Sequence, residues 1–211
     1  LDETERAGVF EGQMRRLRGA ERMQMRFTLQ ARTPERDRWS SVNAAGFGTW
    51  VSSAPGTSRY VYTKRVEGLL APASYRVLLR FRWLDAGGEV VERARAYSRT
   101  CRQPDPRANL VVGSIGVQPA VDPARRRYVV FVRNSGRTDS EPFSLAVSVD
   151  GEPLPPAPVF ALAPGEGTLV TVEGPACVPG APIDAEADAG EVVDERTEAD
   201  NRLTQACPAP S

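Results

Sequence analysis

The sequence predicts an all-β protein that folds as two consecutive β-sandwiches. Residues 22–32 and residues 75–84 alternate between apolar and polar side chains, which is typical of strands with one buried and one solvated face. The second half of the chain carries short apolar segments separated by turn signals about every 8–12 residues. No segment has a convincing helical period, and the length of 211 residues suits two domains of about 100 residues each.

In the first half we expect strands at 22–32, 59–66, 75–84 and 89–100, with shorter candidates at 39–42 and 48–52. Met23, Met25 and Phe27 point to one side of their segment, while the polar residues between them point to the other. Asp85-Ala86-Gly87-Gly88 is a hairpin turn between the strands before and after it.

A connector rich in proline, Cys101–Arg107, follows these strands and places a domain boundary, with predicted domains 1–103 and 104–211. After it we expect strands at 109–117, 127–133, 143–149, 168–173, 183–187 and 202–207. Asp150-Gly151 and Ala163-Pro164-Gly165 are among the turns that separate them. Six or seven short strands in about 100 residues predict an immunoglobulin-like sandwich. The fold class is therefore all-β, with two tandem immunoglobulin-like β-sandwiches.

The second half resembles the bacterial cell-adhesion-related domain family (CARDB) in five motifs that occur in the family's order. They are Ala108-Asn109-Leu110-Val111-Val112, Val132-Arg133-Asn134-Ser135-Gly136, Phe143 to Gly151, Leu162-Ala163-Pro164-Gly165, and the tail with Asp188, Val193, Glu195, Glu198 and Asn201. The resemblance implies an immunoglobulin-like domain of an exported protein. Asn134 and Gly136 suit a turn that needs a positive φ or a side chain that caps its own backbone.

The first half looks like a fibronectin type III or similar immunoglobulin-like module. Leu70-Ala71-Pro72-Ala73-Ser74-Tyr75 is similar to that fold's approach to its sixth strand, where a tyrosine hydroxyl bonds back to the corner. The segment Pro153–Pro158 is too rich in proline for a central strand, so we expect an edge or a rigid loop there.

Composition excludes several classes of enzyme. Histidine is absent, which rules out Ser-His-Asp and Cys-His catalysis and every metal site with a histidine ligand. No nucleophile elbow or phosphate loop is present. The zero net charge hides a difference between the halves: residues 1–105 hold 19 basic and 12 acidic side chains, and residues 106–211 hold 8 and 15. The first half is therefore basic and the second acidic.

The cysteines indicate an oxidising compartment. Cys177 and Cys207 lie near the ends of predicted strands, and no CxxC spacing suggests a metal site. In an antiparallel sandwich both positions fall at the same end, so a disulfide between them is geometrically reasonable, whereas Cys101 has no obvious partner. The chain begins at Leu1 without an initiator methionine, which is typical of a trimmed cytosolic protein or of one whose signal peptide has been removed, and the cysteines favour the second. No run reaches the roughly 20 apolar residues of a membrane span. We expect an exported protein, secreted or at the cell surface.

Three groups of residues are candidate binding sites, each with an ordinary structural alternative. The acidic run contributes possible calcium ligands, or a solvated surface: Asp188, Glu191, Asp194, Glu195, Glu198 and Asp200. Trp50, Tyr60 and Tyr62 are possible sugar-stacking residues, or core residues. The arginines of the first half, such as Arg26, Arg80 and Arg82, could form a basic patch for anionic polymers, contact the acidic half, or simply occupy outward strand positions.

These observations predict a non-catalytic exported protein that is an adhesive or structural binding module, with a protein or glycan partner and no nucleic acid. An accessory carbohydrate-binding module of a secreted glycan-active enzyme is one alternative, and a calcium-dependent adhesion module is another. No cofactor is expected apart from a possible Ca²⁺. The ligand and the oligomeric state stay open.

Overall fold

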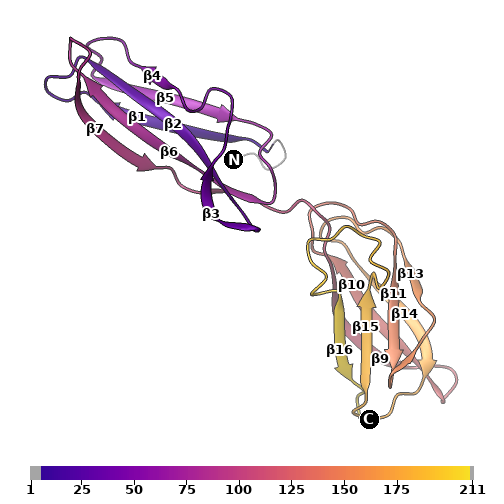
Figure 1. Cartoon of the computed structure of the whole chain (residues 1–211). Helices are drawn as coiled ribbons and strands as arrows, with labels where there is room; N and C mark the ends of the chain where they lie inside the picture. Colours follow the sequence, from indigo (N-terminus) through magenta and orange to yellow (C-terminus); the bar gives the residue numbers. More distant parts are fainter. Residues whose placement is uncertain (1–5, 210–211) are drawn as a thin grey trace. The chain divides into compact units, whose positions relative to one another are not determined.

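The computed structural model describes residues 6–209, and the chain divides into two compact units, Leu1–Asp105 and Pro106–Ser211. Within the described residues every regular element is a β-strand (Figure 1), so the prediction of an all-β fold is confirmed. No helix in that part of the chain is long and apolar enough to cross a membrane.

The first unit is built from two antiparallel sheets. The larger has the order β3-β2-β6-β7, with β4 also paired to β2 and β8 also paired to β6. The smaller pairs β1 with β5. The strands of the larger sheet are β2 (Arg22–Thr33), β3 (Arg36–Ser41), β4 (Trp50–Ser52), β6 (Ala73–Leu84), β7 (Val90–Tyr97) and β8 (Cys101–Gln103), and those of the smaller are β1 (Gly8–Arg15) and β5 (Arg59–Val66).

The core of this unit lies where β1 and β5 cover β2 and β6. Met23, Met25 and Phe27 are completely buried, and the alternate residues of β2 face outward as the sequence pattern predicts. Because both long strands alternate in register, their apolar side chains meet across one face and their polar side chains share the other. The sheet therefore has a buried, apolar inner face and a solvated, polar outer face.

Strand β1 has no counterpart among the sequence-based expectations. Its inward positions include Gly8 and Gly12, so the hydrophobic alternation that marks a strand is too weak to recognise. The glycine at position 12 has a packing reason: a Cβ there would lie 2.7 Å from Leu79 Cδ2 and 3.0 Å from Phe27 Cζ. The small residue lets β1 approach the larger sheet closely.

Two details sharpen the expectations for the first unit. The Tyr75 hydroxyl donates a hydrogen bond of 2.9 Å to the carbonyl of Leu70, which closes the corner before β6. Cys101, expected in a connector, instead begins β8 and lies opposite Tyr75. It is a free, half-buried cysteine, and burial raises the pKa of its thiol.

The second unit is also a pair of antiparallel sheets. One has the order β14-β10-β9, and the other has the order β12-β11-β15-β16 with β13 also paired to β11. The strands are β9 (Leu110–Pro119), β10 (Arg125–Asn134), β11 (Phe143–Val149), β12 (Glu152–Pro153), β13 (Ala157–Val159), β14 (Gly167–Pro175), β15 (Pro182–Ala187) and β16 (Arg202–Ala206). All six strands expected in this half are present.

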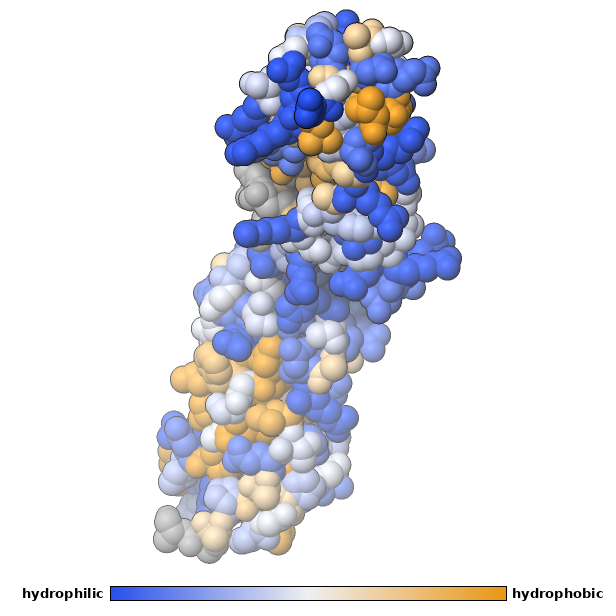
Figure 2. Space-filling model, turned by 90° about the vertical axis from the view of Figure 1, so that its left-hand side faces the viewer, coloured by the Kyte–Doolittle hydropathy of each residue, from blue (hydrophilic) through white to orange (hydrophobic). Residues whose placement is uncertain are grey.

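A buried layer between the sheets holds the second unit together. Tyr128, Leu110, Leu145 and Ile183 are completely buried. The proline-rich segment contributes only the short strands β12 and β13 beside β11, since proline cannot donate to a ladder. On the face drawn in Figure 2, hydrophobic residues gather in one area of the second unit, whereas the first unit is mainly hydrophilic.

Candidate functional site

The acidic residues between β15 and β16 form a loop folded against the start of β9. Glu195 is 4% exposed and Asn201 is 3% exposed. One carboxylate oxygen of Glu195 accepts a hydrogen bond from the backbone N–H of Leu110, and the other accepts one of 2.8 Å from Asn201 Nδ2. Glu195 therefore links the loop to the first strand of the unit.

Burial and neighbouring carboxylates raise the pKa values of two glutamates in this loop. Burial raises the pKa of Glu195, and the charges of Glu198 and Asp188 raise it further, against the lowering effect of its two hydrogen bonds. The pKa of Glu198 is raised as well, first by burial and then by Asp188 and its other acidic neighbours. Glu195 and Glu198 thus retain their protons to higher pH than isolated glutamates do.

The loop also contains buried oxygen atoms without partners. Asp188 Oδ2 accepts a 2.7 Å hydrogen bond from the N–H of Val193, while its Oδ1 has none. The Oδ1 atoms of Asp200 and Asn201 in the loop are likewise buried and unpartnered, and so is Oδ1 of Asn109, which directly precedes β9. Among residues 6–209, however, no group of three or more His, Cys, Asp or Glu side chains is placed to hold a metal ion.

The six predicted calcium ligands are used in different ways. Asp188, Glu195, Glu198 and Asp200 accept hydrogen bonds from the chain itself, and Asp194 pairs with Arg107 at 3.1 Å. Glu191 is exposed and adopts a positive φ of 50°. Within the described residues the structure therefore joins most of them to protein groups, and whether Ca²⁺ binds stays a prediction.

A second buried side chain, Asn134, organises the same end of the unit. Its Oδ1 accepts hydrogen bonds from the N–H groups of Asn109 and Gly136, and its Nδ2 donates to the carbonyls of Thr138 and Leu162. The side chain caps its own turn, which is one of the two expectations. Neither Asn134 nor Gly136 has a positive φ. Gly136 is required instead by close approach, because a Cβ there would lie 2.5 Å from backbone atoms of Ala108.

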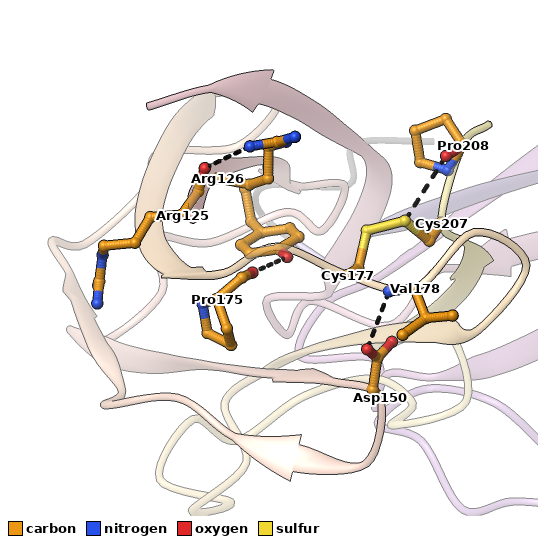
Figure 3. Close-up of a disulfide and its surroundings, with 9 residues drawn as sticks. Arg125, Arg126, Asp150, Pro175, Cys177, Val178, Cys207 and Pro208 are labelled. Carbon is orange, nitrogen blue, oxygen red and sulfur yellow. Dashed lines mark hydrogen bonds between the residues drawn. A yellow bond between two sulfur atoms is a disulfide. The ribbon is translucent and has the colours of Figure 1, made fainter. Parts of the chain in front are cut away.

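The predicted disulfide between Cys177 and Cys207 is present (Figure 3). The two Cα atoms are 6.0 Å apart and the residues are 30 positions apart in the sequence. Beside it, Asp150 Oδ2 accepts a 3.0 Å hydrogen bond from the N–H of Val178. The bond therefore fixes the segment after β14 to the end of β16.

The structure does not bring the three candidate stacking residues together. Tyr60 and Tyr62 are half-buried and pack against the core of the first unit, and the Tyr62 ring lies 6.2 Å from that of Phe27. Trp50 lies directly opposite Arg26, a residue of the outer face of the larger sheet. The guanidinium of Arg82 stacks on the Trp50 ring at 4.1 Å. Trp50 is therefore the aromatic of this group that belongs to a solvated face.

Comparison with models of protein families finds a match in the second unit. The CARDB family model matches residues 107–205. The second unit contains a CARDB domain. No curated protein matches the chain. The match covers the acidic loop, Asn134 and Gly136, so these belong to the CARDB domain, whereas Trp50 and its neighbours lie outside it.

Solved structures similar to the chain include two single domains and one chaperone. A CARDB domain from Pyrococcus furiosus, solved in complex with di-metal ions, has 25% identity, a TM-score of 0.40, and coverage of 46% of this chain and 84% of its own. A domain of a protein named as a cell surface protein from Methanosarcina acetivorans has 20% identity, a TM-score of 0.42, and coverage of 50% and 95%. The class 5 fimbriae chaperone CfaA has 11% identity, a TM-score of 0.32, and coverage of 98% and 94%.

The CARDB match at residues 107–205 supports a surface or structural module. CARDB domains and all-β immunoglobulin-like folds are typically non-catalytic, and within the described residues the buried carboxylates of the loop contact protein donors.

Proposed function

We propose that the chain is a non-catalytic module that acts outside the cell or at the cell surface and holds a protein or glycan partner there. The observation that carries the proposal is the CARDB domain at residues 107–205. The disulfide between Cys177 and Cys207 supports export, because such bonds persist in oxidising compartments.

The hydrogen bonds that the acidic loop forms within the CARDB domain support a structural role for this domain. Glu195 joins the loop to Leu110, and Asn134 joins the next turn to Asn109. Both residues are buried, so they stabilise the domain and do not face a substrate. We therefore assign the domain the role of a rigid module, and we expect partner contacts on its exposed surfaces.

The accessory carbohydrate-binding alternative is supported by Trp50. This half-buried ring lies on the solvated outer face of the larger sheet of the first unit, and aromatic rings are the usual contacts of sugars in binding modules. A panel of neutral polysaccharides decides between the two: retention of the chain on a neutral glycan, lost in Trp50→Ala, would favour the accessory module.

The proposal is tested with the full chain carrying a fluorescent label. It is incubated with intact cells of its source, before and after treatment with protease or with periodate. We expect saturable binding that excess unlabelled chain displaces and that one treatment removes, protease for a protein partner or periodate for a glycan. Absence of saturable binding, or release of products from a panel of polysaccharides, would overturn the proposal.

A further inference from the structure

The outer face of the larger sheet in the first unit carries five arginines in two adjacent cross-strand rows. One row runs across four strands and consists of Trp50, Arg26, Arg80 and Arg95, each directly opposite the next. The neighbouring row consists of Ser52, Gln24, Arg82 and Arg93. We call the five arginines together with Trp50 the arginine face.

The register places these charges close together. Opposite residues of antiparallel strands have Cα atoms about 5 Å apart. Arg26, Arg80 and Arg95 therefore follow one another across three strands within about 10 Å. Like charges placed directly opposite each other destabilise a sheet, so this arrangement costs stability when nothing neutralises it.

None of the five arginines forms a salt bridge with a described carboxylate. The ion pairs of the first unit involve other residues, such as Arg32 with Asp37 at 3.4 Å. Arg82 donates to the neutral amide oxygen of Gln24, and Arg26 Nε is buried without a partner. Glu92 accepts from the backbone N–H of Arg93, not from its guanidinium. The positive charge of the face is thus left for a partner to neutralise.

The arginine face is also hollowed. Trp50, Arg80, Arg82, Arg93 and Arg95 line a cleft of about 400 Å³, completed by Phe81 and Ala94. Arg80, Arg93 and Arg95 are exposed, whereas Trp50 and Arg82 are half-buried and stacked on each other at 4.1 Å. Stacking holds the Arg82 guanidinium in one orientation, so its remaining N–H groups need less ordering when they bind an anion.

We propose that the arginine face binds a linear acidic polysaccharide, carrying carboxylate or sulfate groups, across strands β4, β2, β6 and β7. Guanidinium groups bind such anions in a bidentate manner, and successive charged sugars would meet successive arginines of a row. At one end of the row Trp50 supports Arg82, whose guanidinium its ring holds in place by stacking at 4.1 Å.

The observations favour a glycan over a single-stranded nucleic acid. Nucleic-acid channels combine cations with several aromatic platforms for successive bases. In the described residues the Trp50 ring is stacked against Arg82 at 4.1 Å and the Trp39 ring against Arg76 at 4.3 Å, so neither offers an open platform to a base. The disulfide indicates an oxidising compartment, where acidic glycans are the more accessible polymers.

The inference rests on the proposed binding function and gives it a site and a ligand class. The test measures the affinity of the full chain by calorimetry for a heparin oligosaccharide, which is sulfated, and for oligogalacturonate, which is carboxylated. Neutral dextran and a single-stranded oligonucleotide of similar length are the comparison ligands. We expect binding to at least one acidic glycan, weaker as salt rises, and none to dextran.

Arg80→Gln/Arg95→Gln is the decisive variant, and Arg15→Gln/Arg59→Gln is its matched control. The control pair also lies directly opposite on two strands, β1 and β5, and removes the same charge from the other sheet. We expect the first variant to bind at least about tenfold more weakly and the control to lose less than about threefold. Trp50→Ala is expected to weaken glycan binding without abolishing it, and melting curves verify that each variant is folded.

Two results would overturn the inference: no binding to either acidic glycan, whether or not the oligonucleotide binds, or equal weakening by the two arginine pairs. The cell-binding assay separates this outcome from failure of the proposed function. If Arg80→Gln/Arg95→Gln attaches to cells as the unmodified chain does, the arginine face is not the site but the binding function stands. If the unmodified chain does not attach, the proposed function itself fails.

Discussion

The side-chain amide of Asn201 donates a hydrogen bond of 2.8 Å to Oε1 of Glu195, and both residues are almost completely buried. Because Oε2 of the same carboxylate accepts from the N–H of Leu110, one acidic side chain joins the last loop of the CARDB domain to its first strand. The link lies beside other carboxylates, so it depends on protonation.

The stability of the CARDB domain should depend on pH through Glu195. Its pKa in the folded state is raised above the ordinary value of about 4.5, chiefly by burial. The unfolded chain therefore releases this proton first as pH rises, and the contribution of Glu195 to stability decreases between its ordinary pKa and its raised one. The measurement is the melting temperature of the wild type and of Glu195→Gln at intervals of pH. As pH rises through this window, the melting temperature of the wild type should fall relative to that of Glu195→Gln.

Glu152→Gln, which changes an exposed glutamate outside the loop, is the control for this experiment. Its melting temperature should follow that of the wild type over the same pH range. A difference between the wild type and Glu195→Gln that stays constant with pH would contradict the prediction.

Gly136→Ala should destabilise the CARDB domain by about 3 kcal/mol or more, because the new methyl group would overlap backbone and not a movable side chain. The added Cβ would lie 2.5 Å from the Cα and carbonyl carbon of Ala108. Urea unfolding measures the effect. Gly190→Ala is the matched control, since its Cβ would meet only Val192 Cγ2 at 3.6 Å, and it should change the free energy of unfolding by less than about 0.5 kcal/mol.

Removing the disulfide should cost the CARDB domain about 3–4 kcal/mol, since the bond closes a loop of 30 residues and restricts the unfolded chain. The variant is Cys177→Ser/Cys207→Ser, and chemical unfolding under non-reducing conditions measures the loss. Cys101→Ser, at the free cysteine, is the control and should retain a cooperative transition in the second unit. Equal unfolding curves for the double variant and the wild type would show that the bond is not formed in solution.

Much of the fold follows from local patterns, and the exceptions have physical reasons. The alternation in β2 and β6 and the turn glycines of the second half are visible in the sequence because each element carries its own signal. Strand β1 has glycine at two inward positions, and at Gly12 a larger side chain would overlap Leu79 and Phe27. That constraint comes from another strand, so β1 alone does not reveal it.

The candidate sites were less predictable, since each depends on pairing across strands. The sequence indicates many arginines in the first half, but the opposition of Arg26, Arg80 and Arg95 is set by the register of β2, β6 and β7. In the same way, an acidic run of residues does not reveal that Glu195 is buried against Leu110. Residue types could be predicted here, and their neighbours could not.

Calcium should leave the melting temperature of the chain unchanged. The cation requires about 6–8 oxygen ligands. Of the six candidate carboxylates, four already accept a hydrogen bond from the protein and a fifth, Asp194, forms an ion pair with Arg107. A ligand that bound only the folded state would raise the melting temperature, so scans in millimolar CaCl₂ and in EDTA are a direct measurement. Asp188→Asn is the variant to compare, because Asp188 has a buried oxygen without a partner. Stabilisation by Ca²⁺ in the wild type that disappears in Asp188→Asn would contradict the prediction and assign a cation to this loop.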